Sequence, residues 1–367
     1  MSSHRRSLFL AVLVWVQACS GGQHPTRVGS ETSASSTQQP LRGDNLFGAD
    51  ANPTGNPLGG GPGYGRILSS GDFRVASAPE LVAALGRATS GQVVYVADSA
   101  RIDLSGMKDI RIPAGVTLAS GRGRGGSNGA LIFATPLDTY PLFQAGGPGV
   151  RVTGLRLQGP DGERRTEQMK QLYAEGRYYS IPNSDGIQSS HPGLEVDNCE
   201  IWAWSHGGVY LKAGSTANVH HNDIHHCQRE GLGYGVVLDQ ADAIIEANRF
   251  DYCRHHIAGT GRPGTSYEAR YNLVLENANS HSFDMHGGVD RGDGTDIAGS
   301  LILIHHNTFR AAAVSAVVIR GRPLQIADVY NNVFAQTNST AAVKQTASSG
   351  NVRHYRNQYG PTRAQLD

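Results

Sequence analysis

The chain has 367 residues, and its 32 lysine and arginine residues against 31 aspartate and glutamate residues give a formal net charge of +1 at pH 7. This balance excludes the strong positive field that nonspecific binding of nucleic acid or of a membrane surface requires. Glycine contributes 47 residues, about 13% of the chain against an average near 7%. Such a composition favours a structure with many tight turns.

The first 19 residues are predicted to be an export signal. Arg5 and Arg6 precede an apolar run at residues 8–16, which is too short to span a bilayer. The run into Cys19 resembles a bacterial lipoprotein box, which implies lipidation of Cys19, and the alternative is ordinary cleavage at Val-Gln-Ala. We therefore expect an exported protein, either a cell-envelope lipoprotein or secreted, that contacts the membrane only through an N-terminal lipid.

Two N-terminal segments precede the repeats. Residues 20–70 are rich in Ser, Gly, Thr, Gln, Asn and Pro and have few large apolar residues, so they are predicted to form a flexible tether. Residues 77–91 predict a short amphipathic helix, because Ser77 and Glu80 form a capping-box pattern ahead of apolar residues at helical spacing. We expect this helix to cap the open end of a stack of repeats.

A repeat in the mid-twenties of residues organises the chain from residue 194 to residue 359. Each copy contains a short apolar segment, whose last members are Ile201, Ile224, Phe250, Val274, Phe309, Phe334 and Tyr359. In six copies an asparagine lies two residues earlier, namely Asn222, Asn248, Asn272, Asn307, Asn332 and Asn357. In the first copy Asn198 is displaced by one position and Cys199 takes the expected place. A period of this length indicates one supersecondary unit stacked on copies of itself.

The strand pattern extends this stack towards the N-terminus. Further strands are predicted at residues 93–97, 110–112, 116–119, 131–134 and 150–157. Coils of two or three short strands joined by asparagine turns resemble the right-handed parallel β-helix of the pectate-lyase-like superfamily. The resemblance implies an all-β domain over residues 71–367, with asparagines that hydrogen-bond from coil to coil. We expect a monomer.

Three cysteines remain after removal of the signal, and an odd number argues against a disulfide-built scaffold. Cys227 and Cys253 each lie three residues past the repeated apolar residue, so they are expected to stack on neighbouring coils. Buried thiols are favoured for these two and for Cys199, and a disulfide between Cys227 and Cys253 is left open.

The functional side chains are expected on the second strand of each coil. Side chains alternate between the two faces of a strand, and alignment of these strands gives an outward column of Lys212, Asp239, Thr260, His286 and Arg320. A neighbouring column contains Tyr210, Val237, Ala258, Asp284 and Val318. Parallel strands lie about 4.8 Å apart, so Asp284, His286 and Arg320 are expected to converge. Insertions at residues 160–182 and 287–299 are expected to form walls beside this surface. The alternative is an ordinary solvated face.

This arrangement favours a polysaccharide lyase that acts on a uronate-containing, acidic polymer. β-Elimination removes a proton next to a carboxylate, which must be neutralised while a base takes the proton. We predict His286 as the base and Arg320 and Arg322 as carboxylate clamps. Asp239 and Asp284 are predicted to orient histidine or to hold a metal, with calcium as the ion considered. The predicted substrate-binding residues are Lys212, Asp239, His281 and Tyr210.

Two other functions remain open. The sequence Asn-Ser-Asp-Gly-Ile at residues 183–187 resembles the first catalytic motif of polygalacturonase-type hydrolases, which would use Asp185, Asp239 and Asp284 as carboxylates. The aspartate pair that those enzymes carry on the next coil is missing here. The other possibility is a noncatalytic glycan-binding surface protein. A zinc site from His225, His226, His255 and His256 near the cysteines is also considered, although the spacing fits no standard zinc motif.

Overall fold

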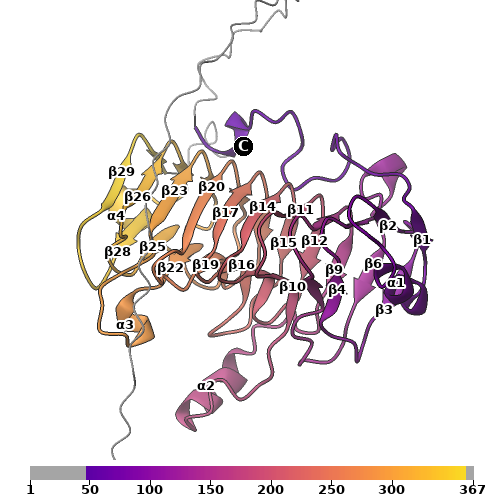
Figure 1. The fold of residues 1–367 in the computed structure, drawn as a ribbon. Helices are drawn as coiled ribbons and strands as arrows, with labels where there is room; N and C mark the ends of the chain where they lie inside the picture. The colour runs from indigo at the N-terminus through magenta and orange to yellow at the C-terminus, as the bar shows by residue number, and fades with distance from the viewer. Residues whose placement is uncertain (1–46, 361–367) are drawn as a thin grey trace, which may run out of the picture. The chain divides into compact units, whose positions relative to one another are not determined.

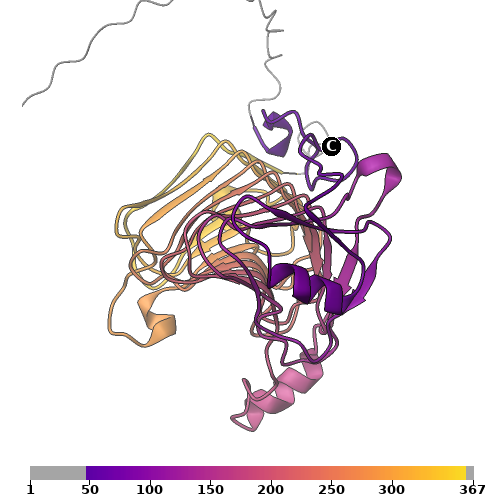
Figure 2. The same cartoon turned by 45° about the vertical axis from the view of Figure 1, so that its right-hand side comes forward.

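The computed structural model describes residues 47–360, which form three sheets in which every pairing of neighbouring strands is parallel (Figures 1 and 2). The chain visits the sheets in turn, so strands of one sheet come from successive coils. The prediction of a right-handed parallel β-helix is therefore confirmed.

The first sheet has eleven strands: β1 (Phe73–Val75), β2 (Val93–Val96), β5 (Thr117–Ala119), β8 (Arg151–Thr153), β11 (Leu194–Asp197), β14 (Thr216–His220), β17 (Asp242–Glu246), β20 (Ser266–Arg270), β23 (Leu301–His305), β26 (Ile326–Tyr330) and β29 (Val352–Tyr355). The second has nine: β4 (Ile110–Ile112), β7 (Phe143–Ala145), β10 (Asp185–Ser189), β13 (Gly207–Leu211), β16 (Tyr234–Leu238), β19 (His255–Gly259), β22 (Phe283–Met285), β25 (Val317–Ile319) and β28 (Val343–Gln345). The third has ten: β3 (Arg101–Asp103), β6 (Leu131–Phe133), β9 (Arg156–Gln158), β12 (Glu200–Trp202), β15 (Asp223–His225), β18 (Arg249–Asp251), β21 (Leu273–Val274), β24 (Thr308–Phe309), β27 (Val333–Phe334) and β30 (Gln358–Tyr359).

The predicted capping helix is α1 (Ala78–Leu85), which packs against β1, β2 and β4 at the end of the stack (Figure 1). Oε2 of Glu80 accepts hydrogen bonds from the backbone N–H groups of Ala76 (2.8 Å) and Ser77 (3.1 Å), which completes the expected capping box. Leu81 and Leu85 are buried. The helix therefore closes the core where β1 would otherwise leave it open.

Stacked asparagines hold successive coils together as the period predicted. Oδ1 of Asn272 accepts from the backbone N and from Nδ2 of Asn248, both at 3.0 Å, and its own Nδ2 donates to Asn307 (2.9 Å) and to the carbonyl of Ile245 (2.8 Å). The same pattern runs from Asn222 to Asn357. Because each buried amide is fully paired, the ladder avoids the cost of about 1–3 kcal/mol for each unsatisfied group.

The turn beside the ladder is made by the residue that precedes each asparagine. These residues have positive φ near 50–55°, and they are His221, Ala247, Tyr271, His306, Asn331 and Arg356. The asparagine itself follows the turn and points inward. In the first copy Asn198 takes the left-handed position (φ 54°), and the backbone N of Cys199 donates to Asn222. This explains the one-residue displacement found in the sequence.

Residues 47–70 differ from the expected tether, because they lie along the β-helix (Figures 1 and 2). The backbone N of Gly48 donates to Asn331 O, that of Gly59 to Ala247 O (both 2.9 Å), and that of Gly61 to Oδ1 of Asn198 (2.7 Å). The hydroxyl of Tyr64 also donates to Asp197 (2.8 Å), so the segment is held by specific backbone and side-chain bonds that its composition does not reveal. The rest of the predicted tether, the export signal and Cys19 lie outside the described residues. Between residues 47 and 360 no helix is long and apolar enough to cross a membrane.

The cysteines follow the favoured prediction: Cys199, Cys227 and Cys253 are buried and free. The short helices outside the stack are η1 (Ala49–Ala51), η2 (Arg124–Gly126), α2 (Thr166–Ala174), α3 (Gly288–Arg291) and α4 (Ser339–Ala342). Helix α2 lies in the connection that enters β10 of the nine-stranded sheet, whereas α3 lies in the connection that leaves β22. Both insertions project from the same side of the coil stack (Figures 1 and 2). One precedes a strand of the nine-stranded sheet and the other follows one, so they border the two opposite ends of the strands of that sheet.

Candidate functional site

The outer face of the nine-stranded sheet carries the columns that the sequence predicted. The strand register pairs Tyr210 with Val237, Ala258 with Asp284, and Asp284 with Val318. One position beyond the paired ends of the strands lie Lys212, Asp239, Thr260, His286 and Arg320. The alignment made from the asparagine repeat was therefore in the correct register.

Asp284 is the centre of a compact polar cluster on this face. Arg320 donates two hydrogen bonds to it, from Nε to Oδ1 and from Nη2 to Oδ2, both at 2.8 Å. Nε2 of His281 lies 3.1 Å from Oδ1, and Nε2 of His286 lies 2.8 Å from Oδ2. We name Asp284, His255, His281, His286 and Arg320 the Asp284 cluster. The expected convergence of Asp284, His286 and Arg320 is confirmed, and His281 joins them.

The Asp284 carboxylate is fully buried and remains ionised. Burial alone would raise the pKa of Asp284, but its contacts with the imidazoles of His281 and His286 hold that pKa well below its ordinary value. The guanidinium of Arg320 supplies the balancing charge, and its Nη1 also reaches Asp290 on α3 at 3.2 Å. Asp284 is therefore suited to orient imidazoles and unsuited to donate a proton.

His255 is the buried member of the cluster and lies on the neighbouring coil. Its Nδ1 donates to the carbonyl of His281 (2.6 Å), so Nε2 carries the lone pair and faces Asp284 at 3.4 Å. Burial lowers the pKa of His255 well below 6.5, which keeps this imidazole neutral. The side chains of His281 and His286 are 22% and 27% exposed. These two imidazoles are the members of the cluster that a ligand can reach.

Two predicted site residues have other partners. Asp239 accepts from the hydroxyl of Thr260 (2.7 Å) and from Arg262 (2.9 Å), so it does not join Asp284 as a pair of metal ligands. The metal site predicted from Asp239 and Asp284 is thus not formed. Arg322 lies 3.4 Å from Asp296 in the α3 insertion and is half exposed, outside the Asp284 cluster. The charged partners, Arg262 and Asp296, both come from loops whose path the repeat does not determine.

A second grouping on the same face surrounds Asp185, and we name its members Asp185, His206, Gln188, Tyr140, Tyr210 and Lys212 the Asp185 cluster. Asp185 is fully buried, and its Oδ1 lies 2.8 Å from Nδ1 of His206. Its Oδ2 accepts from Nε2 of Gln188 (2.7 Å). With Asp185 acting as an acceptor, Nδ1 of His206 carries the proton and Nε2 is left with the lone pair.

Aromatic rings and one cation complete the Asp185 cluster. The imidazole of His206 lies 5.0 Å from the ring of Tyr210 and 5.9 Å from that of Tyr140. Nζ of Lys212 lies 5.3 Å from the centre of the Tyr210 ring and 5.8 Å from that of Tyr140. Burial and the carboxylates of Asp239 and Asp185 raise the pKa of Tyr210 to about 12. The cluster thus combines an imidazole, protonated phenols and an ammonium group.

Tyr234 connects the two clusters. Its ring lies 5.5 Å from His206 and is stacked on His255 at 5.8 Å with an interplanar angle of 7°. Arg254 comes just before His255, and its Nε and Nη1 are buried without a hydrogen-bond partner among residues 47–360. A guanidinium in this state is costly unless an anion reaches it.

Sequence reasoning missed His206, Tyr234, Arg254 and the role of His255 for a geometric reason. The ring of His256 lies 5.7 Å from that of Phe250 in the core, and Ile257 is also buried there. Two successive side chains therefore point inward at the start of β19. The strict alternation of side chains between the two faces of the strand fails at this bend. The side chain of His255 therefore lies on the outer face. The signal that could have revealed the outward position of His255 is the strand register, which pairs His255 with Tyr234 on the preceding coil.

The floor between the two clusters is small and apolar. Val237 and Ala258 are buried and pack with Tyr234, and Tyr210 and Leu232 border them. Beside this strip, a hollow of 590 Å³ lies against the α2 insertion, and its lining includes Tyr173, Tyr178, Tyr179 and Glu230. Apolar and aromatic surfaces between convergent polar groups are typical of ligand sites.

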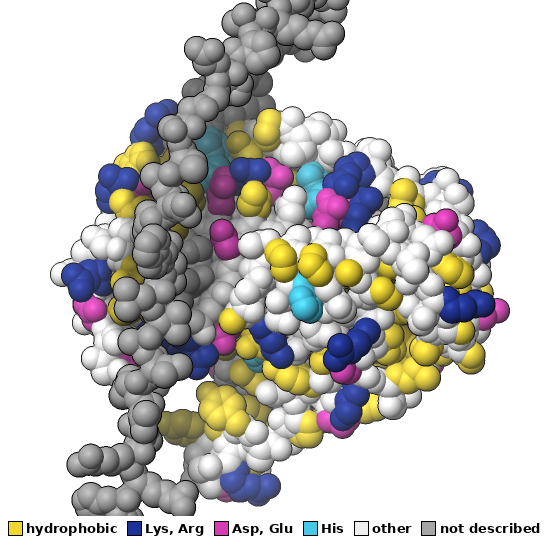
Figure 3. Space-filling model, viewed as in Figure 1, with side chains coloured by type: hydrophobic (Ala, Val, Ile, Leu, Met, Phe, Trp, Pro, Cys, Tyr) yellow, Lys and Arg dark blue, Asp and Glu magenta, His cyan; other side chains and the backbone are white. Residues whose placement is uncertain are grey.

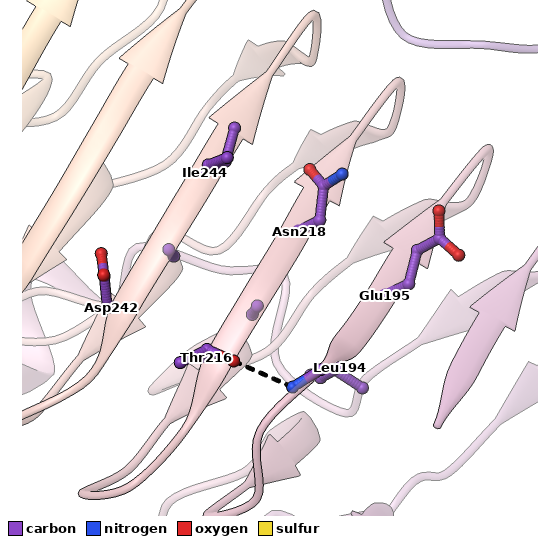
Figure 4. A pocket seen from close by; sticks show the side chains of 9 residues that line it. Leu194, Glu195, Thr216, Asn218, Asp242 and Ile244 are labelled. Carbon is purple, nitrogen blue, oxygen red and sulfur yellow. Dashed lines mark hydrogen bonds between the residues drawn. The ribbon is translucent and has the colours of Figure 1, made fainter. Parts of the chain in front are cut away.

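A different hollow, of 370 Å³, lies on the eleven-stranded sheet (Figure 4). Its lining includes Leu194, Glu195, Asn218 and Asp242, which come from three neighbouring strands. It contains no histidine, and Glu195 is already paired with Arg66 and His220. On the face drawn in Figure 3, acidic and basic side chains of the described residues are interspersed. The nine-stranded sheet therefore remains the better candidate.

The possible metal ligands of the Asp284 cluster do not fit calcium. Ligand atoms of His255, His281 and Asp284 lie within 4.8 Å of one another, but calcium prefers oxygen ligands. Arg320 also donates to both oxygens of Asp284, and its Nη2 lies 2.9 Å from Nε2 of His281. The predicted zinc set is not brought together. His225 contacts Glu200, whereas His256 lies in the core.

Comparisons with known proteins agree with this fold. The family model described as a right-handed beta helix region matches residues 185–359. An alginate lyase from Paenibacillus sp. str. FPU-7 has a TM-score of 0.58 and 16% identity, with 79% of this chain and 95% of that chain covered. The mannuronan C-5 epimerase A-module of Azotobacter vinelandii has a TM-score of 0.45 and 10% identity, with coverage of 79% and 100%. A family 28 exopolygalacturonase of Yersinia enterocolitica has a TM-score of 0.38 and 11% identity, with coverage of 80% and 69%.

No curated protein sequence matches the chain. The chain therefore has the fold of a right-handed parallel β-helix.

Proposed function

We propose that this protein is an exported polysaccharide lyase that cleaves a uronate-containing polymer on the outer face of its nine-stranded sheet. The observation that carries the proposal is the state of the charged groups there. The buried carboxylates of Asp185 and Asp284 are both in contact with imidazoles, and the groups presented to a ligand are imidazoles, phenols and cations. An alginate lyase with the same fold is consistent with this substrate class.

His286 is the proposed base. Asp284 lies 2.8 Å from Nε2 of His286, which favours the tautomer with the proton on that nitrogen and leaves the lone pair on Nδ1. In the reaction Nδ1 takes the proton from the carbon next to the uronate carboxylate. The electron pair of that C–H bond forms the new C=C bond, the glycosidic C–O bond breaks, and the leaving oxygen is protonated.

Arg320 is the proposed carboxylate clamp. Its Nε and Nη2 are held by Asp284, whereas its Nη1 makes a longer contact (3.2 Å) to the partly exposed Asp290. We propose that the substrate carboxylate displaces Asp290 from this position. Arg322, which is 53% exposed, then acts from the rim rather than at the reacting sugar.

Hydrolysis is less well supported. A glycoside hydrolase needs one carboxyl group as acid and another as base or nucleophile. Here Asp185 is bound by His206 and Gln188, Asp239 by Thr260 and Arg262, and Asp284 by Arg320. None of these three carboxylates is therefore free to act as the acid or the base of a hydrolase.

A panel of uronate polymers and neutral polymers tests the proposal. Ultraviolet absorbance from an unsaturated uronate end should appear with at least one uronate polymer and with no neutral polymer. Release of reducing ends without that absorbance would show hydrolysis, and binding without cleavage would show a glycan-binding protein. Deuterium incorporation from heavy water without absorbance would retain proton abstraction but refute elimination.

A further inference from the structure

We infer that the Asp185 cluster is a separate subsite that binds another uronate unit of the same polymer, with Lys212 as the receptor of its carboxylate. The inference rests on the proposed function for the identity of the ligand as a uronate chain. It assigns to His206 and Tyr140 a role in sugar binding that the sequence did not indicate.

The first argument is the charge of Lys212. Within residues 47–360 its ammonium group forms no ion pair, and its nearest described partners are the faces of Tyr140 and Tyr210. Most arginines on and near this face are already matched to a carboxylate, as Arg262 is to Asp239 and Arg320 to Asp284. An unpaired ammonium between two aromatic rings is suited to a carboxylate on a flat sugar ring.

The second argument is the way His206 is held. A fully buried carboxylate is costly to keep unless its partners are well placed, and Asp185 has two, His206 at 2.8 Å and Gln188 at 2.7 Å. The His206 side chain is 15% exposed, so its edge is open to a ligand. Since Asp185 fixes Nδ1 as the protonated nitrogen, Nε2 is preset to accept a hydrogen bond from a sugar hydroxyl.

The third argument is spacing. Tyr210 is separated from Asp284 by three steps of the stack, through Val237 and Ala258. Three steps of about 4.8 Å place Tyr210 roughly 14 Å from Asp284. The strip between them is apolar, since it is formed by the buried side chains of Val237 and Ala258. One sugar unit cannot reach both clusters, whereas a short oligosaccharide can lie across the strip. The protein is therefore expected to prefer chains over short fragments.

The test compares Lys212→Met and His206→Gln with Lys344→Met as the control. Lys344 lies on β28 of the same sheet, is exposed and forms no ion pair among the described residues. Calorimetry in a His286→Ala background measures the affinity for a uronate disaccharide and hexasaccharide without cleavage. Lys212→Met and His206→Gln should each weaken hexasaccharide binding about tenfold, equivalent to about 1.4 kcal/mol. They should leave disaccharide binding at the Asp284 cluster unchanged, and Lys344→Met should leave both unchanged.

Kinetics provide the second readout. In the otherwise native protein, Lys212→Met and His206→Gln should raise KM for long chains and leave kcat at saturation unchanged. A large loss of kcat with unchanged affinity would place the chemistry at His206 and overturn the subsite assignment. Equal affinity of all variants for the hexasaccharide would also overturn it. Because binding is measured without turnover, a protein that binds uronates in this way but never cleaves them would refute the proposed function and keep the subsite.

Discussion

Replacing Asp284 by asparagine tests whether the Asp284 cluster is a mutually dependent unit. The substitution keeps the shape of the side chain but removes the charge that both bonds from Arg320 require. Removing one partner of a buried ion pair costs about 3–5 kcal/mol, because the other charge is left uncompensated. Arg320 retains Asp290 and is 22% exposed, so we expect the lower end, about 3 kcal/mol.

Thermal unfolding monitored by circular dichroism measures this loss. With an unfolding entropy of about 2.1 cal/mol/K per residue, a domain the size of residues 47–360 shifts in Tm by about 1.5 °C for each kcal/mol. Asp284→Asn should therefore lower Tm by roughly 4–5 °C. Adding Arg320→Met should recover part of the loss, because no unpaired charge remains. The control Asp239→Asn affects a pair whose arginine is 52% exposed, and such a pair contributes about 1 kcal/mol or less. Equal effects of Asp284→Asn and Asp239→Asn, or no recovery in the double variant, would refute the reasoning.

Three further predictions follow from buried polar groups. Asn272→Leu leaves the backbone N and Nδ2 of Asn248 without their acceptor, so unfolding should be easier by about 2–4 kcal/mol, as calorimetry would show. Burial lowers the pKa of His256 from 6.5 to about 3. Between pH 3 and pH 6.5 the unfolded state therefore binds one more proton than the folded state, so the free energy of unfolding falls as the pH decreases below about 6.5. His256→Phe should remove about 2 kcal/mol of that loss at pH 5, measured by unfolding at pH 7 and pH 5. Arg254→Met should keep or raise Tm while it weakens binding of uronate polymers in a pull-down assay, because the guanidinium has buried, unpartnered nitrogens.

Each of these predictions has a result that contradicts it. An Asn272→Leu protein as stable as the native one would show that the ladder is dispensable at that coil. An unchanged difference between pH 7 and pH 5 in His256→Phe would show that His256 is not the group that titrates. A clear fall in Tm for Arg254→Met, without loss of uronate binding, would assign Arg254 a structural role.

The fold could be predicted from the sequence because one physical requirement, the pairing of a buried asparagine amide, recurs at every coil. A buried amide must be paired on both sides, so Asn248 needs Asn272 one period later, and the period shows in the sequence. The same period sets the register of the strands, and this register predicts that Asp284, His286 and Arg320 lie together. Parallel stacking leaves little freedom in which residue lies beside which.

The remaining features of the site depend on geometry that does not recur. His255 faces outward only because His256 and Ile257 both turn inward at a bend. His206 precedes β13 and comes from a connection rather than a strand. Arg322 is paired with Asp296, which belongs to an insertion, and the repeat period cannot predict the position of an inserted residue. Residues 47–70 are held by individual backbone bonds and by the side chains of Tyr64 and Arg66, and composition carries no information about such contacts.

The most direct test of the central claim is the rate at which unsaturated ends appear when a uronate polymer is incubated with His286→Ala. The matched control is His354→Ala, since His354 is an exposed histidine on β29 of the eleven-stranded sheet. The account predicts that His286→Ala loses at least about a hundredfold in kcat, the low end for loss of a general base, with its Tm close to that of the control. Full activity in His286→Ala, or an equal loss in His354→Ala, would contradict the assignment of the base.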